Sequence, residues 1–221
     1  MIILYTMERE YPYGALRSTN GSKVKVVLAE KGLDFQTQTV RPGDVWKKLP
    51  EVLAKHPLGK VPWIDDGDLT LYDSTVINEY LNEKSAANPL LPLDLQSRSK
   101  VRALENYGDE GVLAKFLPMI WMPWWSPPEQ RDETAMQKGR DGLMTQVLPF
   151  LQTTLDAQDY LCGDFSLADV PMMAVAMVLQ VDGMSVAEFP MVEAYLERLR
   201  QRPSYRLIDP KTPVDDALTS S

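Results

Sequence analysis

The sequence has a single cysteine, Cys162, and a single histidine, His56. One cysteine excludes a disulfide within the chain and any zinc or iron–sulfur site built from several cysteines. One histidine argues against a histidine metal cluster and against a Ser–His–Asp triad. We therefore expect no metal site. We interpret Cys162 as a small hydrophobic core residue and His56 as a structural loop residue.

A basic excess and a long apolar run are missing as well. The chain has 31 acidic and 23 basic side chains, a formal net charge of −8 and a pI of about 4.8. Nucleic acids and anionic membrane surfaces attract basic patches, so we expect neither as a partner. No stretch approaches the ~18 consecutive apolar residues of a membrane span. The segment Met1–Tyr5 lacks the basic region that begins a signal peptide, which favours a cytoplasmic protein.

The composition that remains is that of an ordinary globular protein. Hydrophobic residues make up 44% and charged residues 24% of the 221 residues, enough to bury a sizeable core. Strands are predicted over 2–5, 35–40, 61–64 and 69–72, and helices over 22–31 and from residue 74 onward. The Asp66-Gly67-Asp68 turn predicts a hairpin between the last two strands.

Two segments of this region are predicted to be less regular. Residues 7–17 form a connection longer than most, and residues 46–56 an irregular segment or short helix. In the predicted helix over 22–31, Lys23 and Lys25 lie on the polar side, opposite the apolar side that contains Val24.

Beyond residue 95 the β signals nearly vanish. Helical patterns cover 97–117, 134–158, 168–180 and 191–201, and the proline-rich and aromatic segment 118–128 is expected to break the helices. Such a change of composition marks a domain boundary. We predict an α/β domain with a mixed four-stranded sheet over 1–85, a linker over 86–96, an all-helical domain over 97–208 and a tail over 209–221.

Pro62 stands at the start of a predicted strand, where it cannot donate a ladder hydrogen bond. A cis peptide bond is one way to accommodate it, and this geometry exposes the backbone of Val61 to a ligand. An ordinary edge-strand proline is the alternative.

Two predicted helices begin with clusters of hydroxyl and amide side chains. Asp73 and Ser74 open one helix, where free backbone N–H groups suit a carboxylate and Asp73 suits an ammonium group. Ser18 lies in the cluster before the other, where hydroxyl and N–H groups can hydrogen-bond a thiolate and lower its pKa. In both places, simple helix capping is the alternative.

Four segments together resemble the cytosolic glutathione transferase superfamily, in the same order and at similar spacing. They are 18–24 (STNGSKV), 29–35 (AEKGLDF), 56–77 (from HPLGKVP to DSTVI) and 163–169 (GDFSLAD). The likeness runs from residue 1 to about 208 and implies a thioredoxin-like domain followed by a helical-bundle domain.

The resemblance implies that Ser18 hydrogen-bonds and activates the sulfur of glutathione, with Asn20 assisting. Because the 7–17 connection is longer than is usual in the family, Tyr11 or Tyr13 could reach the sulfur instead, or no hydroxyl could. The other implied glutathione-binding residues are Lys48, Lys60, Val61, Pro62, Asp73 and Ser74.

The resemblance also implies a pocket for an apolar second substrate, built largely from the helical domain. Trp121 and Trp124, with Tyr13 from the loop, could line it. A hydrophobic strap or a dimer contact explains the tryptophans equally well.

The implied activity is transfer of glutathione to a small hydrophobic electrophile by a two-fold homodimer, with glutathione as co-substrate and no metal. Alternatives are a glutathione-dependent disulfide reductase or peroxidase, and a non-catalytic binding or regulatory protein that kept the fold.

Asp169 has a different role. The segment Ser166-Leu167-Ala168-Asp169 has the spacing of a capping box, in which the acidic side chain satisfies otherwise unpaired N–H groups. We expect Asp169 to act in folding, at a cost of about 0.5–2 kcal/mol on replacement by Ala.

Overall fold

The computed structural model describes residues 1–12 and 14–214. The chain divides into two compact units, Met1–Pro89 with Arg206–Ser221, and Leu90–Tyr205. The second unit thus begins inside the expected 86–96 linker, and residues 206–208 group with the first unit instead of the helical one.

The first unit is built on a mixed four-stranded sheet with the order β4-β1-β5-β6. Strand β1 (Ile2–Thr6) pairs in parallel with β4 (Phe35–Thr39) and antiparallel with β5 (Trp63–Asp66). β6 (Leu69–Tyr72) pairs antiparallel with β5, through the predicted turn. The predicted fold class, a thioredoxin-like domain with a mixed sheet, is confirmed.

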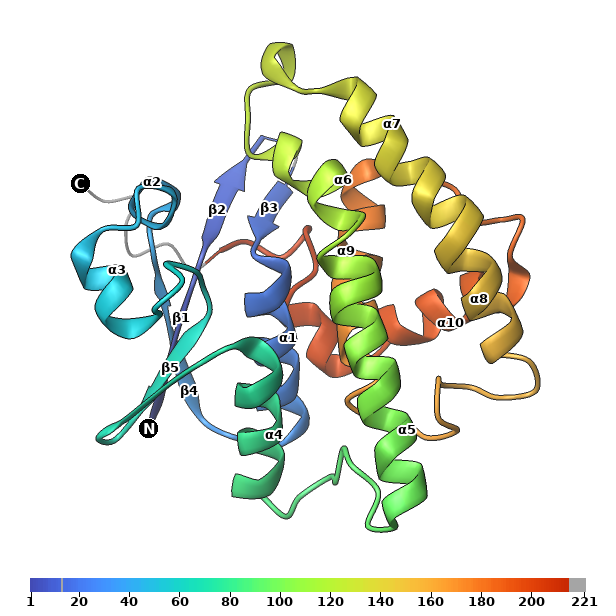
Figure 1. Cartoon of the computed structure of the whole chain (residues 1–221), viewed down its shortest axis with the longest axis horizontal. Helices are drawn as coiled ribbons and strands as arrows, with labels where there is room; N and C mark the ends of the chain where they lie inside the picture. The colour runs from blue at the N-terminus through green and yellow to red at the C-terminus, as the bar shows by residue number, and fades with distance from the viewer. Residues whose placement is uncertain (13, 215–221) are drawn as a thin grey trace. The chain divides into compact units, whose positions relative to one another are not determined.

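Helices α1 (Thr19–Glu30) and α4 (Ser74–Lys84) pack against each other, and α1 also packs on β1 (Figure 1). A hydrophobic cluster forms around the start of β5. It consists of Val45, Val52, Val61 and Trp63, with Tyr5, Met7 and Val40 packed against it. This cluster fixes the position of the strand start that carries Val61 and Pro62.

The segment 7–17 is not the predicted loop but a hairpin of its own. Strands β2 (Glu8–Tyr11) and β3 (Gly14–Arg17) pair antiparallel, with Glu8 opposite Arg17. Gly14 has φ 123°, a conformation that side chains other than glycine rarely adopt. The side chains of Ala15 and Leu16 are fully buried, and this burial stabilises a segment whose sequence shows no clear strand alternation. Tyr13 lies outside the described residues.

The start of the expected tail is anchored to this hairpin. The Ala15 amide donates to the Pro210 carbonyl over 2.9 Å. The buried Arg17 guanidinium donates to the carbonyls of Asp209, Thr212 and Pro213 over 3.0, 2.6 and 3.1 Å. Residues 209–214 therefore belong to the packed first unit, while 215–221 lie outside the described residues.

The segment 46–56 overlaps two short helices, α2 (Pro42–Trp46) and α3 (Pro50–Lys55). Each begins with a proline, whose fixed φ and missing N–H suit the first helical turn.

The second unit is helical, as predicted. α5 (Leu95–Asn106) continues into the π-helical η1 (Tyr107–Leu113), and α7 (Glu133–Gly142) continues through η3 (Leu143–Val147) into α8 (Leu148–Thr154). α9 (Val170–Asp182) is buried along nearly its whole length, and α10 (Pro190–Arg200) packs on it. The short 3-10 turns are η2 (Pro128–Gln130) and η4 (Pro203–Leu207). No helix in the described part of the chain is long and apolar enough to span a membrane.

The expected helix break at 118–128 is wrong for its first half, because α6 spans Leu117–Trp124. Pro118 lies in the first turn, where the absent N–H would have no intrahelical partner, and Pro123 lies in the last turn. α6 packs against α7, where a Cβ on Gly142 would lie 2.2 Å from the Phe116 ring. The missing side chain at Gly142 therefore makes this close approach possible.

Candidate functional site

Ser18 stands at the start of α1 and is nearly buried, with 9% of its surface exposed. Its amide donates to the Met7 carbonyl over 2.8 Å, and its Oγ accepts a hydrogen bond from the Gly21 amide over 3.3 Å. Ser18 therefore caps α1, as the helix-capping interpretation predicts. A hydroxyl that accepts one hydrogen bond still has its own proton to donate, so the cap leaves a donor at the positive end of α1.

Asn20 lies in the same first turn and is half-buried.

Gly21 lets α1 begin directly on the end of β1. An ideal Cβ at Gly21 would lie 1.8 Å from Thr6 Oγ1 and 2.8 Å from Thr6 Cβ. Any side chain at position 21 would displace the helix start and the Ser18 hydroxyl with it.

Asp73 stands at the start of α4 with φ 72°, an uncommon conformation for a residue other than glycine. Its Oδ1 accepts hydrogen bonds from the amides of Thr75 over 3.0 Å and Val76 over 3.2 Å. Asp73 is exposed, and Ser74 beside it is only 6% exposed. Residues with strained backbone conformations are common where a protein binds a ligand. The positive φ of Asp73 is therefore consistent with a role in binding as well as in capping.

Lys23 contacts the candidate site, although the sequence did not predict it there. Its side chain is fully buried, and Nζ donates to Ser74 Oγ over 3.0 Å and to Thr75 Oγ1 over 3.4 Å. Periodicity placed Lys23 and Lys25 on a polar side, yet both are buried. The sequence carried no clear signal for this contact, because Lys23 is the fifth residue of α1 and lies beyond its first turn.

The Val61–Pro62 peptide bond is cis, and both residues are buried just before β5. Lys60 next to them is exposed. Lys48 has φ 50°, and its stem lies over Gly59, where a Cβ would be 2.8 Å from Lys48 Cγ. The fold therefore packs the stem of Lys48 against the loop that contains Lys60, directly before Val61.

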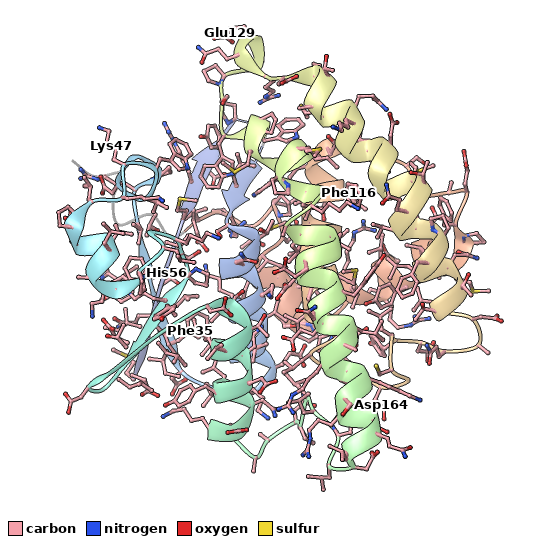
Figure 2. The ribbon with its side chains drawn as sticks, viewed as in Figure 1. Phe35, Lys47, His56, Phe116, Glu129 and Asp164 are labelled. Atoms are coloured by element: carbon pink, nitrogen blue, oxygen red, sulfur yellow. The ribbon has the colours of Figure 1, made fainter. Side chains whose placement is uncertain are left out.

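His56 is buried in this loop, whereas Lys47 projects outward (Figure 2). Its ring lies 5.0 Å from the Tyr72 ring, and Nδ1 accepts from the Leu58 amide over 3.3 Å. Burial lowers the pKa of His56 and Lys60 lowers it further, while Asp73 opposes them. His56 is thus a neutral, structural residue near neutral pH.

The two tryptophans proposed for an electrophile pocket lie on α6 in the second unit. Trp121 is 4% exposed and meets Trp125 edge to face at 6.4 Å. Trp124 is half-buried, with the Arg131 guanidinium 4.0 Å from its ring centre. Burial of Trp121 favours the packing interpretation for that residue, and Trp124 is the more accessible of the two.

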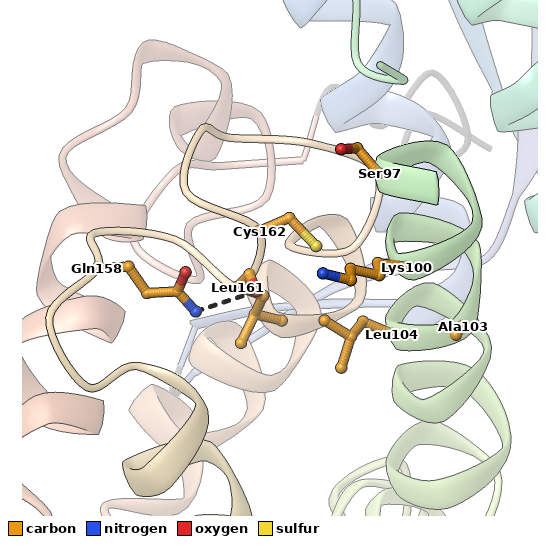
Figure 3. Close-up of a pocket in the computed structure, with 7 residues that line it drawn as sticks. All are labelled: Ser97, Lys100, Ala103, Leu104, Gln158, Leu161 and Cys162. Atoms are coloured by element: carbon orange, nitrogen blue, oxygen red, sulfur yellow. Dashed lines mark hydrogen bonds between the residues drawn. The ribbon is translucent and has the colours of Figure 1, made fainter. Parts of the chain in front are cut away.

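Cys162 lines a pocket of about 420 Å³ in the second unit and is half-buried there. Its Sγ faces the Lys100 ammonium group, and Gln158 donates to the Leu161 carbonyl over 3.2 Å (Figure 3). Burial, followed by the charge of Asp169, raises the pKa of the thiol to about 11. Cys162 is therefore almost entirely protonated at neutral pH, which argues against a nucleophile. Across the described residues, no three His, Cys, Asp or Glu side chains group to hold a metal ion.

Comparison with known proteins matches both halves of the chain. The N-terminal domain model of glutathione S-transferases matches residues 17–84, and the C-terminal domain model matches residues 113–203. Glutathione S-transferase 3 of Zea mays is 30% identical over 202 residues, covering 88% of this chain and 90% of that protein. The stringent starvation protein A homologue of Pasteurella multocida (strain Pm70) is 28% identical over 186 residues, 83% of this chain and 82% of that protein.

The fold has solved counterparts. A glutathione S-transferase from Methylobacillus flagellatus KT, crystallised with glutathione bound, is similar with a TM-score of 0.75 and 26% identity, covering 95% of this chain and all of that one (100%). Both domain models occur in the order that the sequence motifs predicted, and the Zea mays relative is aligned over most of both chains. The chain belongs to the glutathione S-transferase family.

Proposed function

We propose that this protein is a glutathione transferase that binds glutathione on its first unit and holds the sulfur as a thiolate at Ser18. The observation that carries the proposal is the bond between Lys23 Nζ and Ser74 Oγ, 3.0 Å long. Lys23 lies five residues after Ser18, so this bond joins the N-terminal half of α1 to the start of α4. This contact supports a single site that contains both the hydroxyl for the sulfur and the polar groups for the other end of the ligand.

The polar groups of glutathione match those of the site. At the α4 start, Ser74 would donate to the glutamyl α-carboxylate and the exposed Asp73 would pair with the glutamyl ammonium group. The backbone of Val61 before Pro62 would hydrogen-bond the cysteinyl unit. Lys48 and Lys60 would attract the glycyl carboxylate. The glutathione-bound relative from Methylobacillus flagellatus supports this choice of ligand.

The reaction needs a thiolate at neutral pH. An ordinary thiol has a pKa of about 8.5, and a donated hydrogen bond with a helix N-terminus stabilises the charged form. The thiol proton leaves to solvent, a carbon–sulfur bond forms, and the leaving group departs from the electrophile. The electrophile would be small and hydrophobic, and the working assembly would be a two-fold homodimer.

The test is the pKa of the glutathione thiol on the protein, measured by ultraviolet absorbance of the thiolate against pH. The wild type should lower that pKa by at least ~1 unit, and Ser18→Ala should restore the free value while Ser18→Thr keeps the shift. Asn20→Ala should have a smaller effect. Tyr11→Phe and Tyr13→Phe test the two tyrosines. If only one of these variants abolishes the lowering of the thiol pKa, that tyrosine and not Ser18 stabilises the thiolate.

A second candidate is a non-catalytic binding protein on the same fold. The similarity to a stringent starvation protein A homologue supports it, and the Ser18 hydroxyl already has a structural task as a cap. Turnover of an aryl chloride supports the transferase. Turnover of a disulfide or hydroperoxide alone supports a glutathione-dependent reductase or peroxidase. Glutathione binding without any turnover supports the binding protein.

A further inference from the structure

Lys23 places a positive charge inside the first unit, with none of its surface exposed. Burying an ammonium group is costly unless hydrogen bonds compensate. Lys23 Nζ donates hydrogen bonds to two hydroxyls at the start of α4, to Ser74 Oγ over 3.0 Å and to Thr75 Oγ1 over 3.4 Å. Both of these acceptors are neutral hydroxyl groups.

The Lys23 ammonium group lies at the N-terminal end of α4. The first turn of α4 already has a partial positive charge, because its N–H groups point outward from the helix end. Lys23 reaches the same point from α1 and donates a hydrogen bond to Ser74 there. The Asp73 carboxylate caps the amides of Thr75 and Val76, but it lies on the exposed side of the turn. The nearly buried Ser74 hydroxyl therefore lies between the α4 N-terminus, which favours an anion, and the Lys23 ammonium group.

Hydrogen-bond accounting shows that the Ser74 hydroxyl proton does not point toward Lys23. A serine hydroxyl has one proton and two lone pairs, and an ammonium group has protons only. The lone pair of Ser74 that faces Lys23 is used as an acceptor, so the Ser74 proton must point elsewhere. A hydroxyl that accepts a charge-assisted bond is also a stronger donor.

We propose that Lys23 is a positioning residue that orients and polarises the Ser74 hydroxyl toward the α-carboxylate of the ligand's glutamyl group, without touching the ligand. This inference rests on the proposed function, since it assumes that glutathione binds at Ser74. It extends that function by assigning selectivity for a free α-carboxylate to a buried side chain on a different helix.

The test is calorimetric titration with two ligands, reduced glutathione and glutathione whose glutamyl α-carboxylate is an amide. Lys23→Met keeps the stem and removes the charge, and Lys23→Arg restores a charged donor. Lys25→Met is the matched control, because Lys25 is a buried lysine on the same helix that pairs with Glu8 instead. Thermal unfolding checks that each variant is folded, and Lys23→Gln replaces Lys23→Met if the latter does not fold.

Lys23→Met should weaken glutathione binding about tenfold and change binding of the amide less than twofold. Lys23→Arg and Lys25→Met should each stay within about threefold of the wild type. In a Ser74→Ala background, Lys23→Met should have almost no further effect, because Lys23 acts through Ser74. Equal losses for both ligands, or an undiminished effect without Ser74, would overturn the inference while leaving the proposed function intact. A wild type that binds no glutathione would overturn both.

Discussion

The Tyr195 hydroxyl lies 2.8 Å from Asp169 Oδ1, and both side chains are completely buried in the second unit. Burial and the neighbouring Asp169 raise the pKa of Tyr195 well above its usual value, so the tyrosine stays protonated as a donor. Asp169 also accepts from the Leu161 amide at 3.0 Å, and from the amide and hydroxyl of Ser166 at 2.9 and 3.2 Å. One carboxylate thus ties the 161–166 loop and α10 to the start of α9.

Asp169→Ala should therefore cost more than the loss of a simple helix cap. It leaves several buried donors without an acceptor, and each unsatisfied donor costs about 1–3 kcal/mol. We expect a total loss of about 4 kcal/mol or more in the free energy of unfolding. Tyr195→Phe should cost about 1–1.5 kcal/mol. Denaturant unfolding measures both. Asp164→Ala, an exposed carboxylate in the same loop, is the control and should change stability by less than about 0.5 kcal/mol.

His56 is the only histidine in the chain, so its titration can be followed by NMR without ambiguity. Burial and Lys60 lower its pKa, which should lie below the ~6.5 of an exposed histidine. Lys60→Met should raise this pKa, and Asp73→Asn should lower it further, because Asp73 favours the charged ring. Lys47→Met, which changes an exposed lysine at the end of α2, should leave the pKa of His56 unchanged.

The same shift has a consequence for stability. A histidine whose folded pKa is depressed contributes fully above its unfolded value of about 6.5, and the contribution is lost as pH falls through the folded pKa. His56→Gln should remove the loss of folding stability that protonation of His56 causes at acidic pH. A pH profile of unfolding that is the same for wild type and variant would contradict the assignment.

Gly21→Ala should be strongly destabilising, because the new Cβ would lie 1.8 Å from Thr6 Oγ1. Overpacking of this kind costs about 1–3 kcal/mol, and displacement of the α1 start should also weaken glutathione binding. Thr6→Ala should recover part of the lost stability in the double variant, because it removes the clashing oxygen. Gly43→Ala is the control, since nothing lies within 4 Å of its Cβ position.

The Cys162 thiol should react slowly with an aromatic disulfide reagent. With a pKa of about 11, its thiolate fraction at neutral pH is on the order of 100-fold below that of an ordinary cysteine. The rate should rise tenfold per pH unit up to about the pKa. Lys100→Met should slow the reaction, because Lys100 favours the thiolate. The denatured chain should react at the ordinary rate, and Cys162→Ser should bind glutathione like the wild type.

Local signals in the sequence were sufficient wherever a short segment determines its own geometry. The Asp66-Gly67-Asp68 turn predicted the hairpin between β5 and β6, and the helical spacing of Val24, Val27 and Leu28 with a terminal glycine predicted α1. The motifs that identified the family also contained Ser18, Val61 and Ser74, so these positions were available from sequence.

Contacts made by distant parts of the chain were not visible in the same way. The hairpin of β2 and β3 is stabilised by burial of Ala15 and Leu16 and by residues about 195 positions further along the chain, as the bonds of Arg17 show. Lys23 acquires its role only when α4 packs beside α1. Periodicity along one helix cannot reveal such a partner, because it records only which residues share a face.

Calorimetric titration of reduced glutathione into the wild type, beside Ser74→Ala and Ser18→Ala, tests the central claim most directly. We expect saturable binding that Ser74→Ala weakens about tenfold or more, since a donor to the ligand carboxylate is lost. Ser18→Ala should change the affinity less than about threefold, because Ser18 acts on the sulfur and not on the anchoring groups. Absence of any binding at millimolar glutathione would contradict the account, as would binding that Ser74→Ala leaves unchanged.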